Sequence, residues 1–393
     1  MKTDRHIATD NSSAADSSAP VGSGAATAAA LERARAVSRR SFLTYAGLGA
    51  AGLAGVSALA ACSSGASSAS GTTTSGAAAS YGDISLQLSW IKNIEFSGEY
   101  MADSKGYYTK AGFNKVNLVT GPVDSADALV AAGTVTVGLS APDATARVIT
   151  EQGAPLKIIG STYQKNPFCV LSLEEGKPIR TPADLKGKTI GVQTGTNQTI
   201  FAGFLKANNI DPKDLKQVAT GYEPTDLTAK KIDGYIAYLT NEPILVKGEG
   251  FTPVTLSFAD NGLPLTAETF TVTDDTLKNK RDMLKAFLKA EIQGWNDAIA
   301  TGGPAASAEL AVNTYGKDKG LKVDEQTLEA TEQVKLVSTA DTQANGIFTL
   351  TDDLQANIIK ALGIIGITIK GSDLFDLTLL DEVYKENPDL KKG

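Results

Sequence analysis

Histidine is almost absent from this chain of 393 residues, in which His6 is the only one. No imidazole is therefore available beyond position 6 to act as a general base, to ligate a metal ion or to activate a serine. Cysteine is scarce as well, because Cys62 and Cys169 are too few for a disulfide framework or a four-cysteine zinc site. These shortages exclude three large classes of enzyme, and we expect no catalytic residue, metal ion or cofactor.

Positive charge is the next shortage. The chain has 37 basic and 44 acidic residues, and six basic and four acidic ones lie in the first 61, so the remainder carries a formal charge of −9. An acidic body argues against nucleic acid or anionic lipid as a partner. The 42% of hydrophobic residues is enough for a large core, and the length favours two domains.

The N-terminal segment, residues 1–61, has the features of an export signal. A Ser/Ala-rich stretch leads to SRRSFL at 38–43 and a weakly hydrophobic run over 46–61, which is too short for a transmembrane helix. This pattern resembles a twin-arginine signal. The run ends in LAACS, which resembles the bacterial lipobox, where Cys62 would be lipidated and become the first mature residue. The alternative is an uncut membrane anchor in which Cys62 has no role.

The segment after Cys62 has no large apolar residue. Residues 62–80 are mainly Ser, Gly, Ala and Thr, so we expect a flexible tether and a folded body that starts near Tyr81. The predicted location is outside the cell membrane, with the lipid on Cys62 as the anchor. Such a location suits capture, sensing or surface functions better than cytoplasmic metabolism.

The body alternates short β-branched runs with helical segments, which predicts an α/β fold with parallel connections. Two such sets occur, followed by a mostly helical C-terminal segment. We therefore predict two lobes joined by a hinge: residues 81–179 and 266–393 form the first, and 180–265 form the second. The chain would cross between them near 177–181 and 262–269.

Ligands of open α/β sheets bind beyond the carboxyl ends of the strands, so the residues at these ends are the candidate site. In the first lobe, Trp90 offers a flat face next to Asn93 and Glu95, although a tryptophan here could also be a core residue. Asp143 follows another strand, either as a ligand contact or as a helix N-cap. Tyr163 ends a further strand.

The second lobe offers two more candidate segments. Gly195, Thr196 and Asn197 lie between a strand and a helix, where free backbone N–H groups form a cup, but the Gly-Lys-Ser/Thr ending of a P-loop is missing. Tyr238 ends a strand on the face opposite to that of Tyr235. Asn241 and Glu242 follow this strand, and Glu242 could equally be a surface turn residue.

Taken together, the candidates are aromatics, amides and carboxylates without a strong nucleophile, a composition that suits a neutral or weakly basic planar ligand. Two other residues are expected to have a structural role only. Cys169 lies in an apolar strand and Trp295 on an amphipathic helix, so we expect both to be buried packing residues.

Four segments carry a family resemblance: WIKNIEFSGEYMADSKGYYTKAGF at 90–113, TPADLKGKTIGVQTGT at 181–196, KIDGYIAYLTNEP at 231–243 and LFDLTLLDEVYKENPDL at 374–390. Over residues 84–390 the chain resembles the ABC-transporter solute-binding proteins related to the thiamine-pyrimidine-precursor binders and the sulfonate and nitrate binders. The resemblance implies the bilobal type II periplasmic-binding fold. It also implies a monomer that delivers a small solute to a permease and its ATPase.

The resemblance assigns roles to the candidate residues. Trp90 and Tyr163 would stack on a heteroaromatic ring, and Asn241 with Glu242 would accept hydrogen bonds from a ring amine. The cup at 195–197 would close from the second lobe. The expected solute is a thiamine pyrimidine precursor, with riboflavin as an alternative of the same shape.

Other readings stay open at this point. An alkanesulfonate, taurine or nitrate would need a cation at a strand end, for which Lys92, Arg147 and Lys165 are the candidates. A surface-tethered sensor or adhesion module could use the same fold. The family also includes a fungal thiamine pyrimidine synthase that consumes its own histidine, but the body of this chain has no histidine and Cys169 stands alone.

Overall fold

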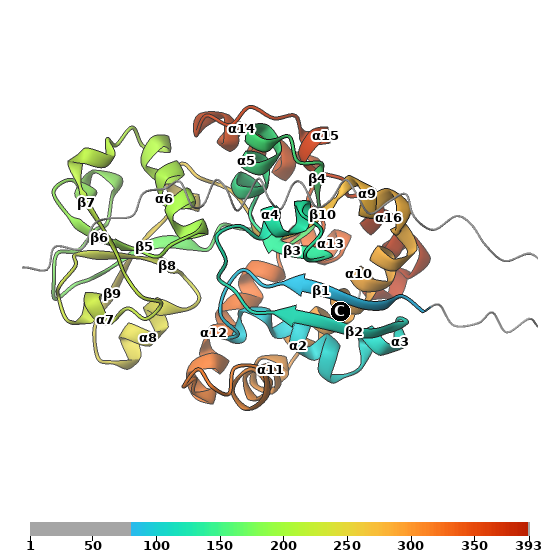
Figure 1. The fold of residues 1–393 in the computed structure, drawn as a ribbon. Helices are drawn as coiled ribbons and strands as arrows, with labels where there is room; N and C mark the ends of the chain where they lie inside the picture. Colours follow the sequence, from blue (N-terminus) through green and yellow to red (C-terminus); the bar gives the residue numbers. More distant parts are fainter. Residues whose placement is uncertain (1–79, 392–393) are drawn as a thin grey trace, which may run out of the picture. The chain divides into compact units, whose positions relative to one another are not determined.

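The computed structural model describes residues 80–391, which belong to one compact unit spanning 75–393 (Figure 1). The predicted signal, the predicted lipidation site Cys62 and nearly all of the tether lie outside the described residues. Among residues 80–391, no helix has both the length and the apolar character needed to cross a membrane.

The first sheet has five strands in the order β2-β1-β3-β10-β4. β1 pairs in parallel with β2 and β3, whereas β10 runs antiparallel to β3 and β4. β10 follows all five strands of the second sheet in the sequence, so the chain returns to the first sheet to supply its last strand. The strands are β1 Gly82–Gln87, β2 Phe113–Val119, β3 Val137–Ser140, β4 Leu156–Tyr163 and β10 Ala267–Thr273.

The second sheet has the order β7-β6-β8-β5-β9. β6 pairs in parallel with β7 and β8, and β5 runs antiparallel to β8 and β9. The predicted α/β class with two sheet-based lobes is confirmed. The strands are β5 Phe168–Leu173, β6 Thr189–Val192, β7 Lys216–Ala219, β8 Gly234–Tyr238 and β9 Pro253–Ser257.

The first crossing between the sheets comes earlier than predicted. β5 at Phe168–Leu173 lies in the second sheet, so the chain crosses between β4 and β5, and the prediction of a crossing near 177–181 is wrong. β5 is a central strand that is buried at every position. Its sequence is therefore one continuous apolar run, which does not indicate the sheet to which the strand belongs. Residues 177–181 instead lie in the connection between β5 and β6, two strands of the second sheet. The chain returns between Asn261 and Ala267.

Helices surround both sheets (Figure 1). The C-terminal part is mostly helical, as predicted from its amphipathic segments. The α-helices are α2 Ser97–Ser104, α3 Tyr107–Lys110, α4 Ala126–Ala131, α5 Pro142–Gln152, α6 Thr196–Ala207, α7 Thr225–Thr228, α8 Glu242–Gly248, α9 Asp274–Asn279, α10 Arg281–Ile299, α11 Gly303–Leu310, α12 Val323–Val337, α13 Ala340–Asn345, α14 Asp352–Ile364, α15 Gly371–Leu374 and α16 Thr378–Glu386. Shorter helical turns are η1 Ile94–Phe96, η2 Pro182–Leu185, η3 Pro212–Asp214, η4 Ala259–Asn261, the π-helical η5 Ala311–Tyr315 and η6 Pro388–Lys391.

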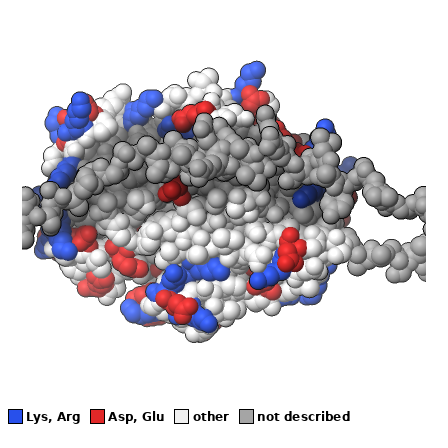
Figure 2. Space-filling model, in the orientation of Figure 1, with Lys and Arg blue, Asp and Glu red and all other residues white. Residues whose placement is uncertain are grey.

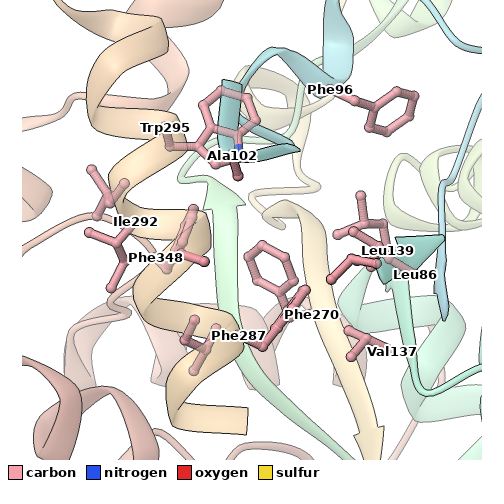
Figure 3. Packing of buried hydrophobic residues seen from close by; sticks show 14 of the residues in the cluster. Leu86, Phe96, Ala102, Val137, Leu139, Phe270, Phe287, Ile292, Trp295 and Phe348 are labelled. Carbon is pink, nitrogen blue, oxygen red and sulfur yellow. The ribbon is translucent and has the colours of Figure 1, made fainter. Parts of the chain in front are cut away.

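The largest hydrophobic core joins the first sheet to α2 and α10 (Figure 3). Trp295 of α10 is 1% exposed, so its predicted role as a packing residue is confirmed, and Cys169 is likewise buried. Gly98 of α2 lies so close to Trp295 that a Cβ there would come within 2.1 Å of the indole Cδ1. The small residue therefore lets α2 and α10 pack closely against each other.

Surface charge is mixed. Figure 2 shows Lys and Arg interspersed with Asp and Glu on the part of this face that described residues form. No broad basic area is seen on that part of the face.

Candidate functional site

A cavity lies where strands of the two sheets end. Residues that follow or begin strands of the first sheet form one side of it, and residues at strand ends and helix starts of the second sheet form the other. This is the position at which open α/β sheets bind their ligands. The lining residues are Ser89, Trp90, Glu95, Ser140, Ala141 and Glu268 from the first side, and Phe168, Asn197, Ala237, Tyr238, Asn241 and Glu242 from the second.

The cavity is closed down in this structure. It holds about 500 Å³ of space between protein atoms, open solvent included, but the centre of a water molecule reaches only about 30 Å³ of it. Each buried water needs roughly 10–15 Å³ of such space. The cavity as it stands therefore takes a few water molecules, and a ring compound enters only when the two sides separate.

Trp90 is held at the mouth of this cavity by the turn that follows β1. Its carbonyl accepts a hydrogen bond from the Gly121 N–H at 2.9 Å. A Cβ at Gly121 would lie 2.5 Å from the Leu88 carbonyl oxygen, so only glycine allows the chain this close to the end of β1. The half-buried Trp90 ring meets the Tyr222 ring of the second side edge-on, with centroids 5.0 Å apart.

Glu268 is the polar centre of the cavity, and it was missed by the sequence analysis. Its backbone has φ of 52°, a left-handed conformation that costs a non-glycine residue about 1–3 kcal/mol. This kink turns the side chain to the strand ends, where Oε2 accepts from Ser89 Oγ at 2.8 Å and Oε1 accepts from Tyr238 OH at 3.3 Å. Ser89 follows β1 and Tyr238 ends β8, so one carboxyl group connects the two sheets.

Glu242 enters the cavity from the first turn of α8. Its carboxyl accepts a hydrogen bond from the Tyr238 N–H at 2.9 Å. An acidic residue followed by Pro243 is favourable at a helix start, where N–H groups are unpaired. Glu242 is therefore not a surface turn residue, because it is 4% exposed, and burial raises the pKa of its carboxyl to about 7.

The carboxyl groups that line the cavity have raised pKa values. Burial raises the pKa of Glu268 to about 7, and burial together with the neighbouring Glu268, Glu242 and Glu99 raises the pKa of Glu95 well above its usual value. Neither lysine nor arginine is among the lining residues that the structure describes.

The three cations considered for an anion site are not in the lining. Arg147 lies on α5 with Nη1 3.6 Å from Glu151, and Lys165 Nζ lies 2.9 Å from Asp260. Lys92 does not reach the cavity either. No described cation is therefore available to neutralise a bound anion.

Several predicted residues do line the cavity. Trp90, Glu95, Asn197, Asn241 and Glu242 are all brought together there. Tyr238 also lines it, whereas Tyr235 points to the opposite face and donates its hydroxyl to the Tyr222 carbonyl at 2.8 Å, as strand alternation predicted.

Asn93 and Tyr163 do not line the cavity. Asn93 is buried and lines an adjoining cavity that shares Trp90 and Asn241 with this one. Its side chain accepts a hydrogen bond from the Glu95 N–H at 3.0 Å, so it holds Glu95 in place. Tyr163 is 1% exposed and packs edge-on against Tyr238 with centroids 6.4 Å apart. In this structure the Tyr163 side chain belongs to the core behind Tyr238, so the predicted stacking on a ligand has no counterpart in the cavity lining.

Asp143 and Gly195 are also outside the lining. Asp143 is wholly buried in the first turn of α5, where burial raises the pKa of its carboxyl to about 6. Gly195 precedes α6, which begins at Thr196, and has φ of 82°. A Cβ on Gly195 would lie 3.1 Å from the Val123 carbonyl oxygen, so this glycine allows a close approach of the chain at 123.

Six lining residues were not predicted from the sequence. Ser89 could have been found because it precedes Trp90, and Glu268 because a charged residue at the start of an apolar strand is unusual. The others carry no distinctive signal, and they are Ser140, Ala141, Phe168 and Ala237. Within residues 80–391, no group of three or more His, Cys, Asp or Glu side chains is arranged to hold a metal ion.

Comparisons with known proteins agree with this geometry. The model of the family described as NMT1/THI5 like matches residues 93–307. The riboflavin-binding protein RibY of Chloroflexus aurantiacus is 24% identical over 250 residues, which are 63% of this chain and 71% of that protein. A putative ABC transporter periplasmic binding protein of Brachyspira hyodysenteriae is 29% identical over 171 residues, 40% of this chain, and the chain spans 48% of its length.

Among solved structures, the periplasmic nitrate-binding protein NrtA of Synechocystis PCC 6803 superimposes with a TM-score of 0.57 and 12% identity, over 78% of this chain and 89% of NrtA. At this identity the likeness concerns the fold alone. The two-sheet architecture is therefore that of a periplasmic binding protein.

Proposed function

This chain belongs to the NMT1/THI5-like family, and from that premise we propose that it captures a flat heteroaromatic solute between its two lobes. The first lobe is built on the first sheet and the second lobe on the second sheet. The protein is an extracytoplasmic solute-binding protein of the ABC-import type, and its relatives are binding proteins rather than enzymes.

The observation that carries the proposal is the composition of the cavity. Three aromatic side chains, Trp90, Phe168 and Tyr238, supply flat apolar surface. Glu242 and Glu268 supply hydrogen-bond acceptors at the same depth. A planar ring with N–H groups at its edge satisfies both, since ring stacking adds about 0.5–1.5 kcal/mol to area burial and each bond to a charged group about 1.5–3 kcal/mol.

A thiamine pyrimidine precursor is the first candidate. Its exocyclic amine can donate hydrogen bonds to the side-chain oxygens of Asn241 and Glu242, which both line the cavity. Its single ring requires little separation of the lobes. Riboflavin is the second candidate, and the similarity to a riboflavin-binding protein supports it. Riboflavin is larger, so it requires wider separation of the lobes.

Nitrate and alkanesulfonates rank last, although a nitrate-binding protein shares the fold. An anion in a low-dielectric cavity next to carboxyl groups is strongly disfavoured unless a cation or several N–H donors neutralise it. The described lining has three carboxyl groups and no lysine or arginine.

Delivery would follow capture. The contact of Tyr238 with Glu268 joins the lobes in the closed form, so the solute would stabilise that form by contacting both sides. The closed form would then dock on an ABC permease driven by its ATPase. We further propose, from the sequence alone, that a lipid on Cys62 anchors the protein to the outer face of the cell membrane.

A thermal-shift assay tests the proposal. The purified protein is heated with 4-amino-5-hydroxymethyl-2-methylpyrimidine, riboflavin, taurine or nitrate. A solute that binds only the folded state at 100 times its Kd adds about 2.7 kcal/mol to stability. We expect at least one ring compound to raise the melting temperature and both anions to leave it unchanged. A rise with an anion and none with either ring would refute the proposal.

A further inference from the structure

Glu95 and Glu268 both line the cavity, and their oxygens can accept more hydrogen bonds than the surrounding groups donate. Glu268 already accepts from Ser89 Oγ at 2.8 Å and from Tyr238 OH at 3.3 Å. Its carboxyl group lines the same cavity as that of Glu95, and its proximity raises the pKa of Glu95 further above the usual value. Two ionised carboxylates are acceptors only, so a direct hydrogen bond between these two groups requires one proton between them.

Glu95 retains an unused acceptor. Its Oε1 has no hydrogen-bond partner among the described residues, although the side chain is only 6% exposed and lines the cavity. A buried carboxyl oxygen without a partner is costly in the free protein. Because Glu95 lines the cavity, a donor on a bound solute would remove the cost.

The surroundings of the pair add negative charge and no positive charge. Glu95 faces Glu242 from α8 and Glu99 from α2, in addition to Glu268 from β10. The tyrosine hydroxyls whose pKa the charge of Glu95 raises bring no cation either, and they are Tyr100, Tyr163 and Tyr238. The mutual repulsion and the burial favour retention of the proton near neutral pH.

We propose that Glu95 and Glu268 form a proton-for-cation exchange site, in which a protonated nitrogen of the solute replaces the proton shared by the two carboxyl groups. The inference rests on the proposed function and names the class of solute: a flat ring that carries a protonated nitrogen with N–H donors, such as an amidinium or a protonated aminopyrimidine. The site loses one proton to solvent and gains one positive charge, so its net charge is unchanged.

The exchange has a structural consequence. With the cation bound, both carboxylates are ionised, the positive charge of the solute offsets one of their two negative charges, and Glu95 Oε1 obtains its missing donor. A neutral flat ring, such as that of riboflavin, can stack on Trp90 but cannot displace the proton. The site therefore selects cationic over neutral rings.

The first test needs no ligand. Glu268→Gln keeps the shape and a donor toward Glu95 but has no proton to lose. The matched control is Glu291→Gln, which changes a buried carboxyl outside the cavity that accepts from Tyr108 OH at 2.5 Å. We expect the melting temperature of the unmodified protein to fall from pH 5.5 to pH 8.5 and that of Glu268→Gln to fall less. Identical pH profiles for the unmodified protein and Glu268→Gln would overturn the proposal.

The second test uses benzamidinium and riboflavin in calorimetric titrations at pH 7, in phosphate and in Tris, whose heats of ionisation differ. We expect benzamidinium to bind with release of about one proton, Glu268→Gln to bind it at least tenfold more weakly without release, and Glu291→Gln to match the unmodified protein. Binding of benzamidinium without proton release, or no binding at all, refutes the exchange. Tight riboflavin binding with no benzamidinium binding refutes the exchange and keeps the proposed function.

Discussion

Replacing Trp90 by alanine removes the flat surface at the mouth of the cavity. The half-buried ring lines the cavity on one side and meets the Tyr222 ring on the other, with centroids 5.0 Å apart at an interplanar angle of 79°. The substitution therefore has two separable effects. One is the loss of contact with the solute, and the other is the loss of a ring pair between the lobes.

The magnitude follows from these contacts. Stacking contributes about 0.5–1.5 kcal/mol, and covering roughly 60–80 Å² of apolar surface at about 25 cal/mol per Å² adds about 1.5–2 kcal/mol. The sum of about 2–3.5 kcal/mol corresponds to a loss of roughly 30- to 300-fold in affinity. Trp90→Phe keeps a ring in place and should lose less than about tenfold.

Tyr222→Ala is the matched control. Tyr222 is 42% exposed and is not part of the inner lining, so its removal eliminates the same ring pair and leaves the solute contact of Trp90. Calorimetric titration with the ring compound that gives the largest thermal shift measures all three variants, and thermal unfolding checks that each is folded. We expect Tyr222→Ala to lose less than about tenfold.

Two results would refute this reasoning. An affinity of Trp90→Ala within about threefold of the unmodified protein would remove Trp90 from the binding surface. An equal loss in Tyr222→Ala would assign the effect to the contact between the lobes and not to stacking on the solute.

Three further predictions concern stability and are read by thermal or denaturant unfolding. Gly98→Ala should destabilise the fold by about 1–3 kcal/mol, because the new Cβ would lie 2.1 Å from Trp295 Cδ1, and an unchanged melting temperature would contradict this packing. Tyr108→Phe should cost about 1–3 kcal/mol, since it leaves the buried carboxyl of Glu291 without its 2.5 Å donor, and a neutral effect would contradict it. The ligand-free protein should be more stable at pH 5 than at pH 8. Burial raises the pKa of Glu268 from 4.5 to about 7, so this stabilisation is complete below pH 4.5 and is lost as the pH rises through 7, by up to about 3 kcal/mol; a flat or rising profile would oppose it.

Local patterns predicted the fold class well because alternating apolar runs and amphipathic segments are properties of neighbouring residues. The site at strand ends followed from the same patterns, which is why Trp90, Tyr238 and Glu242 were found. The assignment of β5 at Phe168–Leu173 failed because a strand buried on both faces looks the same in either sheet. Its place is decided by pairing with β8 and β9, which is long-range information.

The direction of side chains at strand ends was the other feature that could not be predicted from the sequence. Tyr163 was predicted to stack on the solute, but the pairing of β4 with Ala267 of β10 directs it into the core. Glu268 reaches the cavity through a backbone with φ of 52°, which no periodicity predicts for a strand residue. Both outcomes depend on the ladder between β4 and β10, whose register shifts between Thr269 and Thr271.

The central claim is that a flat solute is held between the two sheets at the carboxyl ends of their strands. A crystal structure of the protein with the most strongly stabilising ring compound tests it most directly. We predict the ring against Trp90 and Tyr238, with an edge nitrogen within about 3 Å of a Glu95 or Glu268 oxygen. A ring bound elsewhere on the protein, with this cavity still closed, would contradict the account.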